Sequence, residues 1–259
     1  MVAGGALALV VAGATVLALA SRGGTEAWVP LSAEVPANDP LAPPLASGLA
    51  VPHPQLLAVR DASTTSSWAP VVRPLRLRAA PSATAAVVAR VGVSTPERTA
   101  NVVLVTGRTR AAADLWVPVR AENVAGWAPR ASLGGYESVD TRLEVDTHAL
   151  TATLLRAGRV VFRAPVGIGT ANAPTPTGSF YVRNRLTRYR SPFYGPVAFG
   201  TSARSSLTDW PAGGFVGVHG TNRPDLIPGR VSHGCIRLRN ADIVALARLM
   251  PVGTPIEIR

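Results

Sequence analysis

The sequence predicts a mainly β protein that has two modules and one helix near its C-terminus. Short apolar runs separated by turn residues recur from about residue 68 onward, which is typical of all-β folds. The pair Gly134 and Gly135 divides these runs into two regions. After the N-terminal segment, only residues 243–250 place apolar side chains at helical spacing. A length of 259 residues with 47% hydrophobic content is sufficient for two modules with cores of their own.

Residues 1–20 are expected to direct export, either as a signal peptide or as a membrane anchor. The run carries no charged side chain, is rich in Ala, Leu and Val, and ends in Ala-Leu-Ala, which fits a small-residue cleavage site. It is also nearly long enough to span a bilayer, so cleavage and retention both stay open. The expected location is outside the cytoplasm, in the cell wall or periplasmic space, with the chain secreted or membrane-anchored.

Residues 21–67 are predicted to be a Pro/Ala-rich linker. They show little sustained periodicity and contain runs such as Pro-Ala-Asn-Asp-Pro and Ala-Pro-Pro. Because Pro-rich segments are extended and semi-rigid, such a linker would hold the following modules away from the membrane surface.

Residues 68–134 are predicted to form a small β-barrel. Four short apolar runs alternate with turn residues here, at 75–78, 87–91, 102–105 and 115–119. The Leu-Arg-Leu-Arg run, followed by Leu-Trp-Val and later by Ala-Gly-Trp-Ala-Pro, resembles a bacterial SH3-like domain. Such domains bind peptidoglycan peptides or position an enzyme, but a fold alone does not establish a ligand. Trp116 and Trp127 are assigned to packing in preference to a ligand platform.

Residues 141–259 are predicted to form the second module. Strand-like runs at 142–146, 152–155 and 159–166 surround a hairpin turn at Ala157 and Gly158. The helix after Arg239 has Asn240 or Asp242 as a candidate cap, and residues 254–258 read as a closing strand.

The chemistry of the chain centres on Cys235, which is the only cysteine in the sequence. A thiol attacks acyl carbon as its thiolate, so it needs a neighbouring group that accepts its proton, and His219 and His233 are the two candidates. In the run Ser-His-Gly-Cys, Gly234 permits a sharp turn. The N–H groups of Gly234 and Cys235 are therefore candidate donors to a developing oxyanion.

These residues resemble the catalytic signature of the YkuD-type L,D-transpeptidases, in which a His-Gly pair is followed some fifteen residues later by Ser/Thr-His-Gly-Cys, a hydrophobic residue, and Arg or Asn. The resemblance extends upstream through Pro-Thr-Pro-Thr-Gly at 174–178 and Val-Gly-Ile-Gly at 166–169. It implies a β-sandwich catalytic domain with one C-terminal helix. Some relatives carry Ser and Asn where this chain has Gly220 and Arg237, so a third group that orients His219 beyond a backbone carbonyl stays open.

The same resemblance implies the roles of the site residues. Cys235 would be the nucleophile and His219 the proton acceptor. Oxyanion or pocket support would come from Gly220, Ser232, His233 and Gly234, and substrate binding from Tyr189, Tyr194 and Arg237.

The implied reaction joins peptidoglycan stem peptides. Cys235 would attack the donor tetrapeptide between diaminopimelate and the terminal D-Ala, and an amine of an acceptor stem would then take the acyl group from the thioester. The resemblance also implies that carbapenems acylate Cys235. Two alternatives stay open: an L,D-carboxypeptidase, in which water replaces the acceptor amine, and a non-catalytic peptidoglycan-binding wall protein. A cysteine endopeptidase is disfavoured because a histidine precedes the nucleophile in this chain.

The composition argues against several other classes. The formal net charge is +11, but all 26 basic residues are Arg and they are spread along the chain, unlike the clustered basic residues of nucleic-acid-binding proteins. We therefore expect no nucleic-acid partner. No cofactor is implied, and no metal site either, because two histidines and one thiolate lack a fourth ligand at zinc-like spacing. The oligomeric state is not indicated.

Overall fold

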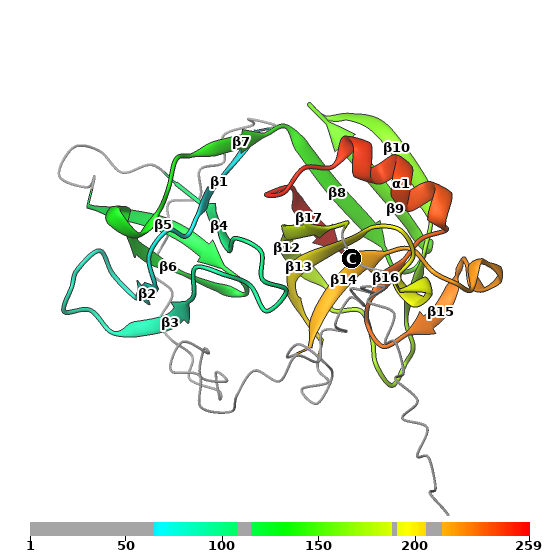
Figure 1. Ribbon diagram of the computed structural model, residues 1–259, viewed down its shortest axis with the longest axis horizontal. Coiled ribbons are helices and arrows are strands. Elements are labelled where there is room, and N and C mark those ends of the chain that lie inside the picture. The colour runs from blue at the N-terminus through cyan, green and yellow to red at the C-terminus, as the bar shows by residue number, and fades with distance from the viewer. Residues whose placement is uncertain (1–64, 108–114, 188–190, 206–213) are drawn as a thin grey trace, which may run out of the picture.

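The computed structural model describes residues 65–107, 115–187, 191–205 and 214–259 (Figure 1). The predicted export segment 1–20 and linker residues 21–64 lie outside the described residues. Within the described residues, no helix is long and apolar enough to cross a membrane.

The first sheet has seven antiparallel strands in the order β3-β2-β6-β5-β4-β1-β7. In chain order they are β1 Ser66–Pro70, β2 Leu75–Arg78, β3 Val87–Val91, β4 Val102–Val105, β5 Trp116–Ala121, β6 Val124–Pro129 and β7 Glu137–Val139, with a 3-10 turn η1 at Arg130–Ser132. Alternate side chains of these strands, such as Leu75 and Leu77 in β2, are buried in one apolar cluster.

The four strands predicted in this region are confirmed, but the limits of the sheet differ from the prediction. Strand β7 follows Gly134 and Gly135 and still pairs with β1. The Gly134 N–H also donates to the Pro70 carbonyl, so the predicted division between the two regions lies within the first sheet. The sheet therefore extends beyond both predicted limits of 68 and 134.

The second sheet has ten strands in the order β10-β9-β8-β17-β12-β13-β14-β16-β11-β15. In chain order they are β8 Thr141–Asp146, β9 Thr151–Arg156, β10 Arg159–Pro165, β11 Gly167–Gly169, β12 Gly178–Leu186, β13 Ala198–Arg204, β14 Phe215–His219, β15 Gly229–Ser232, β16 Ile236–Arg237 and β17 Pro255–Ile258. Two 3-10 turns, η2 Pro192–Tyr194 and η3 Pro224–Leu226, and the helix α1 Asn240–Leu249 complete the described elements. Three neighbouring pairs are parallel, namely β8 with β17, β14 with β16 and β11 with β15.

The predicted hairpin, closing strand and C-terminal helix are confirmed. Ala157 and Gly158 both have positive φ angles, 47° and 76°, as a two-residue hairpin turn requires. The predicted cap of α1 is wrong: the N-cap position is Arg239, and no side chain caps the helix.

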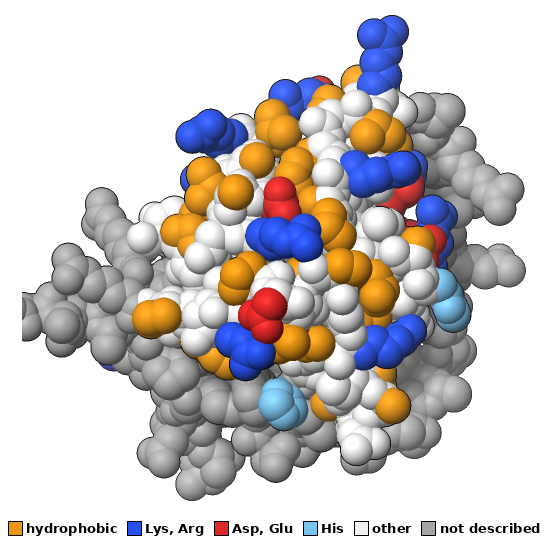
Figure 2. Space-filling model, turned by 90° about the vertical axis from the view of Figure 1, so that its right-hand side faces the viewer, with side chains coloured by type: hydrophobic (Ala, Val, Ile, Leu, Met, Phe, Trp, Pro, Cys, Tyr) orange, Lys and Arg blue, Asp and Glu red, His pale blue; other side chains and the backbone are white. Residues whose placement is uncertain are grey.

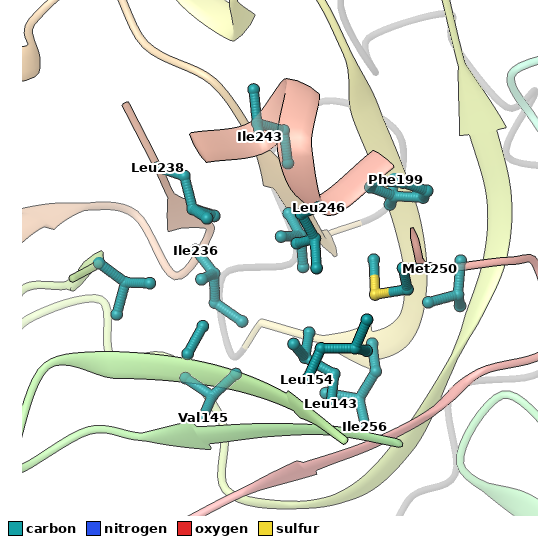
Figure 3. Packing of buried hydrophobic residues seen from close by; sticks show 14 of the residues in the cluster. Leu143, Val145, Leu154, Phe199, Ile236, Leu238, Ile243, Leu246, Met250 and Ile256 are labelled. Atoms are coloured by element: carbon teal, nitrogen blue, oxygen red, sulfur yellow. The ribbon is translucent and has the colours of Figure 1, made fainter. Parts of the chain in front are cut away.

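The two layers of the expected sandwich are parts of one curled sheet. Figure 3 shows the apolar core between them, with side chains of β8 and β9 on one side and side chains of β16 and α1 on the other. The fully buried residues at this contact include Leu143, Leu154, Ile236, Leu238, Ile243 and Leu246. The apolar stripe of α1 therefore closes the core on the same side as β16, the strand that follows Cys235.

The surface that faces away from the first sheet carries arginine side chains scattered among hydrophobic and neutral ones (Figure 2). On this face they form no single basic patch.

The two sheets contact each other through buried polar groups. The Tyr181 hydroxyl of β12 donates to the Val102 carbonyl of β4 at 3.1 Å and accepts from the Glu122 N–H at 3.1 Å. Tyr181 is 1% exposed, and burial raises the pKa of its hydroxyl, so the group stays protonated and able to donate.

Replacing Tyr181 by Phe should lower the free energy of unfolding by about 1–3 kcal/mol, because a buried carbonyl and a partly buried N–H each lose a partner. Chemical denaturation measures this loss. Tyr136→Phe is the matched control, since Tyr136 is 49% exposed and should change stability little. Equal stability of the two variants would contradict the contact between the sheets.

Candidate active site

The parallel pairing of β14 with β16 brings the candidate catalytic residues together. Val218 pairs with Ile236, and His219 pairs with Arg237. Because side chains alternate along a strand, His219 and Arg237 share one face, and Val218 and Ile236 point from the other face into the core, where both are fully buried. Cys235 immediately precedes Ile236 and lies on the His219 face. The prediction that Cys235 and His219 meet in the fold agrees with this register.

The Cys235 thiol is held in a buried position against β14. The Gly217 N–H donates to Sγ at 3.4 Å, and the residue is 8% exposed. Burial raises the pKa of the thiol, and the Gly217 N–H and the positive charge of Arg237 oppose this only in part. The thiol is therefore protonated in the resting site and needs a base when it reacts.

The His219 imidazole is the candidate for that base. Its Nδ1 lies 2.6 Å from the Gly220 carbonyl oxygen. Because a carbonyl only accepts, Nδ1 carries the proton and Nε2 keeps its lone pair. Among the described residues Nε2 has no hydrogen-bond partner. Burial, aided by the charge of Arg237, lowers the pKa of His219 to about 3, so the ring is neutral.

A Gly220 carbonyl thus orients the imidazole. A Cβ atom on Gly220 would collide with the Asn240 side chain and with Gly195. Asn240 Oδ1 also accepts from the Thr221 N–H at 2.9 Å. Instead of capping α1, the Asn240 side chain fixes the loop after His219. This role could not be predicted from the sequence, because the position of Asn240 at a helix start indicates a cap.

The Ser-His-Gly-Cys turn is closed by its own hydrogen bonds. Ser232 Oγ donates to the Cys235 carbonyl at 2.6 Å and accepts from the Gly234 N–H at 3.1 Å. Gly234 has a φ of 111°, which side chains rarely allow. Since the Gly234 N–H is occupied by Ser232, its predicted use as an oxyanion donor does not hold in this resting structure. The Cys235 N–H stays a candidate.

Thr175 supports the same turn from the preceding loop. Its hydroxyl donates to the Gly234 carbonyl at 2.8 Å and accepts from the Gly169 N–H at 2.9 Å. A Cβ on Gly169 would collide with the backbone of residues 173–175. The Pro-Thr-Pro-Thr-Gly motif was the available signal for this role, but the sequence alone does not show which threonine faces the nucleophile.

Aromatic side chains of η2 border the site. The Tyr194 ring meets the His219 ring edge to face at 4.7 Å, and Phe193, 39% exposed, lies under the Arg237 guanidinium at 4.6 Å. Burial and the nearby Cys235 raise the pKa of Tyr194 to about 12. Tyr194 therefore packs behind the base, and Phe193 is the more exposed of the two. Predicted Tyr189 lies outside the described residues.

The remaining predicted residues occupy different environments. His233 is exposed, whereas its neighbours Ser232 and Gly234 are buried, so the structure favours His219 over His233 as the base. Arg237 is 8% exposed, and burial lowers the pKa of its guanidinium. Among the described residues, no group of three His, Cys, Asp or Glu side chains gathers as a metal site requires.

Comparisons with known proteins agree with this geometry. A family model described as the L,D-transpeptidase catalytic domain, YkuD, matches residues 140–258. YkuD of Bacillus subtilis strain 168, which is named as an L,D-transpeptidase, is 35% identical over 121 residues, covering 47% of this chain and 67% of the relative. YbiS of Escherichia coli K12, also named as an L,D-transpeptidase, is 37% identical over 83 residues, covering 32% of this chain and 26% of the relative.

Two solved structures illustrate the likeness. The catalytic domain of the Enterococcus faecium L,D-transpeptidase is 24% identical, with a TM-score of 0.37, and the match covers 46% of this chain and 96% of that one. An L,D-transpeptidase from Mycobacterium smegmatis is 17% identical, with a TM-score of 0.40, and the match covers 65% of this chain and 93% of that one.

The family assignment rests on the sequence matches. The model match begins at residue 140, after the first sheet, so the SH3-like resemblance of that sheet stays a prediction. The match to YkuD covers two thirds of that relative at more than 30% identity, and this chain therefore belongs to the L,D-transpeptidase family with a YkuD-type catalytic domain.

Proposed function

We propose that this chain forms peptidoglycan crosslinks between third-position diaminopimelate residues through a thioester on Cys235. One observation carries the proposal: the Gly220 carbonyl holds His219 Nδ1 so that the Nε2 lone pair is available on the face that holds the only thiol of the chain. A nucleophile, a base and a group that orients the base are the parts that covalent acyl transfer requires.

The first half-reaction consumes the donor tetrapeptide. Nε2 of His219 takes the proton of the Cys235 thiol as sulfur bonds to the carbonyl carbon of diaminopimelate. The bond from that carbon to the D-Ala nitrogen then breaks, and the imidazolium returns the proton to the departing amine. The products are free D-Ala and a thioester on Cys235, with His219 neutral again.

The second half-reaction repeats these steps in reverse order on the acceptor stem. The side-chain amine of its diaminopimelate attacks the thioester, and Nε2 accepts a proton from that amine. The carbon–sulfur bond breaks, and the imidazolium protonates the thiolate. The crosslink and a free thiol result, so one pair of side chains serves both halves. Water in place of the amine would release a tripeptide instead.

Arg237 and Phe193 suit the recognition of a stem peptide. Arg237 lies on the His219 face, and its planar fork of donors matches a carboxylate, which stem peptides carry. Exposed Phe193 supports the guanidinium from below. We propose that the pair binds a stem carboxylate beside the thiol.

The substrate also sets the location. Peptidoglycan stems are crosslinked outside the cytoplasm, so the proposal includes export, with residues 1–20 acting as the signal or anchor and the residues from 21 up to β1 as the tether. Acylation of Cys235 by a carbapenem belongs to the same proposal, because an activated amide would react with the thiol as the donor stem does.

Cys235→Ser should abolish crosslinking, and His219→Ala should lower its rate by about 10²–10⁴-fold, the usual contribution of a general base. Each full-chain variant is incubated with disaccharide-tetrapeptide, and mass spectrometry of the products measures crosslinking. The expected wild-type product is a dimer that lacks one D-Ala.

His148→Ala is the matched control and should keep wild-type activity, since His148 is exposed and belongs to the turn after β8. If the wild-type chain released tripeptide and formed no dimer, its activity would be that of an L,D-carboxypeptidase and not of a crosslinking enzyme. Bound but unchanged substrate would replace it by a recognition protein.

Alkylation of Cys235 by iodoacetamide should rise about tenfold per pH unit between about pH 6 and about pH 8. The reason is that burial raises the pKa of the thiol and lowers that of His219, so the resting pair is neutral and the thiolate appears only as pH rises. Intact-mass spectra read this one thiol directly. A rate that is level across this range would show a thiolate and imidazolium formed in advance, and would contradict the neutral pair.

A further inference from the structure

The first sheet reaches the catalytic strands through a buried acidic side chain. Glu97 lies between β3 and β4, in a short turn closed by the bridge from Ser94 to Ala100. Its carboxylate accepts two hydrogen bonds from Arg183 Nη2 of β12, at 3.0 and 3.2 Å. The side chains of Arg183 and Glu97 are 1% and 4% exposed. Because a buried ion pair is costly to desolvate, it often contributes little stability, and a positioning role is the better reason for its presence.

Arg183 transmits this contact to β14. Its guanidinium lies 3.6 Å from the centre of the Phe215 ring, and its Nε and Nη1 atoms have no hydrogen-bond partner in the described residues. The positive charge is therefore balanced by Glu97 and by the face of the ring. Phe215 is the first residue of β14, the strand that ends at His219.

A second arginine holds the same ring from the other face. Arg204 of β13 lies 3.9 Å from the Phe215 ring centre. Two guanidinium groups this close to one centre cannot share a face, so the ring is stacked between them. Glu122, in the turn between β5 and β6 of the first sheet, accepts from Arg204 Nη2 at 2.8 Å and from Nε at 3.0 Å. Both arginines that clamp Phe215 are thus held by carboxylates of the first sheet.

A parallel set of contacts reaches the middle of β14. Asn184 of β12 donates through Nδ2 to the Glu97 carboxylate at 3.0 Å and to Thr99 Oγ1 at 2.9 Å. Its Oδ1 accepts from the Gly200 N–H at 2.9 Å. Gly200 pairs with Gly217, whose N–H contacts the Cys235 thiol. A small cavity between these strands is lined by Glu97 as well as by Phe215, Gly217 and His219.

We propose that Glu97 and Glu122 of the first sheet are positioning residues of the active site. Through Arg183 and Arg204 they fix Phe215, and with it the placement of the Gly217 N–H and the His219 ring beside Cys235. The effect on crosslinking rests on the proposed function. The effect on the thiol itself does not, because it concerns only the contact between Gly217 and Sγ.

The test compares Glu97→Gln and Glu122→Gln in the full chain. Each variant keeps the shape of the side chain and removes the charge that holds an arginine. We expect a fall in kcat of about tenfold or more with KM nearly unchanged, since the thiol and base lose alignment and the substrate contacts remain. We also expect iodoacetamide to label Cys235 about three- to tenfold more slowly at about pH 8, because the hydrogen bond that favours the thiolate weakens.

Three further variants make the result specific. Glu144→Gln is the matched control, because its ion pair with Arg142 lies on β8, separated from β14 by β17, β12 and β13. It should leave kcat and labelling unchanged. Glu122→Asp should recover part of the kcat and part of the labelling rate, because it restores the carboxylate charge. Phe215→Leu should lower kcat and the labelling rate as the Glu→Gln variants do, because it removes the ring between the two arginines. Glu122 and Arg204 are 20% and 30% exposed, so this pair tests the idea even where Glu97→Gln unfolds the protein.

The outcomes separate the two proposals. Folded Glu122→Gln and Phe215→Leu proteins, verified by thermal melting, with wild-type kcat and wild-type or faster labelling would overturn the positioning role. The positioning role would also be overturned if the losses of kcat and of labelling rate in every variant matched the fraction of that variant that is unfolded. A wild-type chain that forms no crosslink would end the proposed function, whereas slower labelling in the variants would still support the positioning role.

Discussion

The active site depends on one short parallel contact, that between β14 and β16. This pairing sends Val218 and Ile236 into the core and leaves His219, Arg237 and the adjacent Cys235 on the opposite face. The apolar core therefore fixes the register of the catalytic face, because a slip of one residue would exchange the two faces and expose the buried side chains. The helix α1 secures the arrangement by packing Ile243 and Leu246 over the same core.

Burial at this face gives the site its electrostatic character. It disfavours both the thiolate of Cys235 and the imidazolium of His219, so the resting pair holds one proton on sulfur and one on Nδ1. The positive charge of Arg237 lowers the pKa of His219 further, whereas on Cys235 it counteracts the rise in pKa that burial causes. Such a site holds the thiol in its protonated, less nucleophilic form at neutral pH.

Two kinds of polar contact hold the loops around this face. Within the second sheet, Ser232, Thr175 and Asn240 satisfy backbone groups of the turns that carry Cys235 and follow His219. Between the sheets, the buried Tyr181 hydroxyl and the pair of Glu97 with Arg183 make polar contacts. Because buried polar groups require specific partners, these contacts allow few alternative placements of the first sheet.

The sequence by itself determined the local features of this protein. Turn residues and apolar periodicity placed the β8–β10 strands, the Ala157-Gly158 turn and α1, since these depend on neighbours in the chain. A single cysteine within Ser-His-Gly-Cys made Cys235 the candidate nucleophile. Tertiary structure distinguished the two candidate bases, because His219 is buried and contacts the Gly220 carbonyl whereas His233 is exposed. It also decided the roles of Thr175, Asn240 and Glu97, whose partners lie far away in the chain and are brought near only by strand pairing and packing between the sheets.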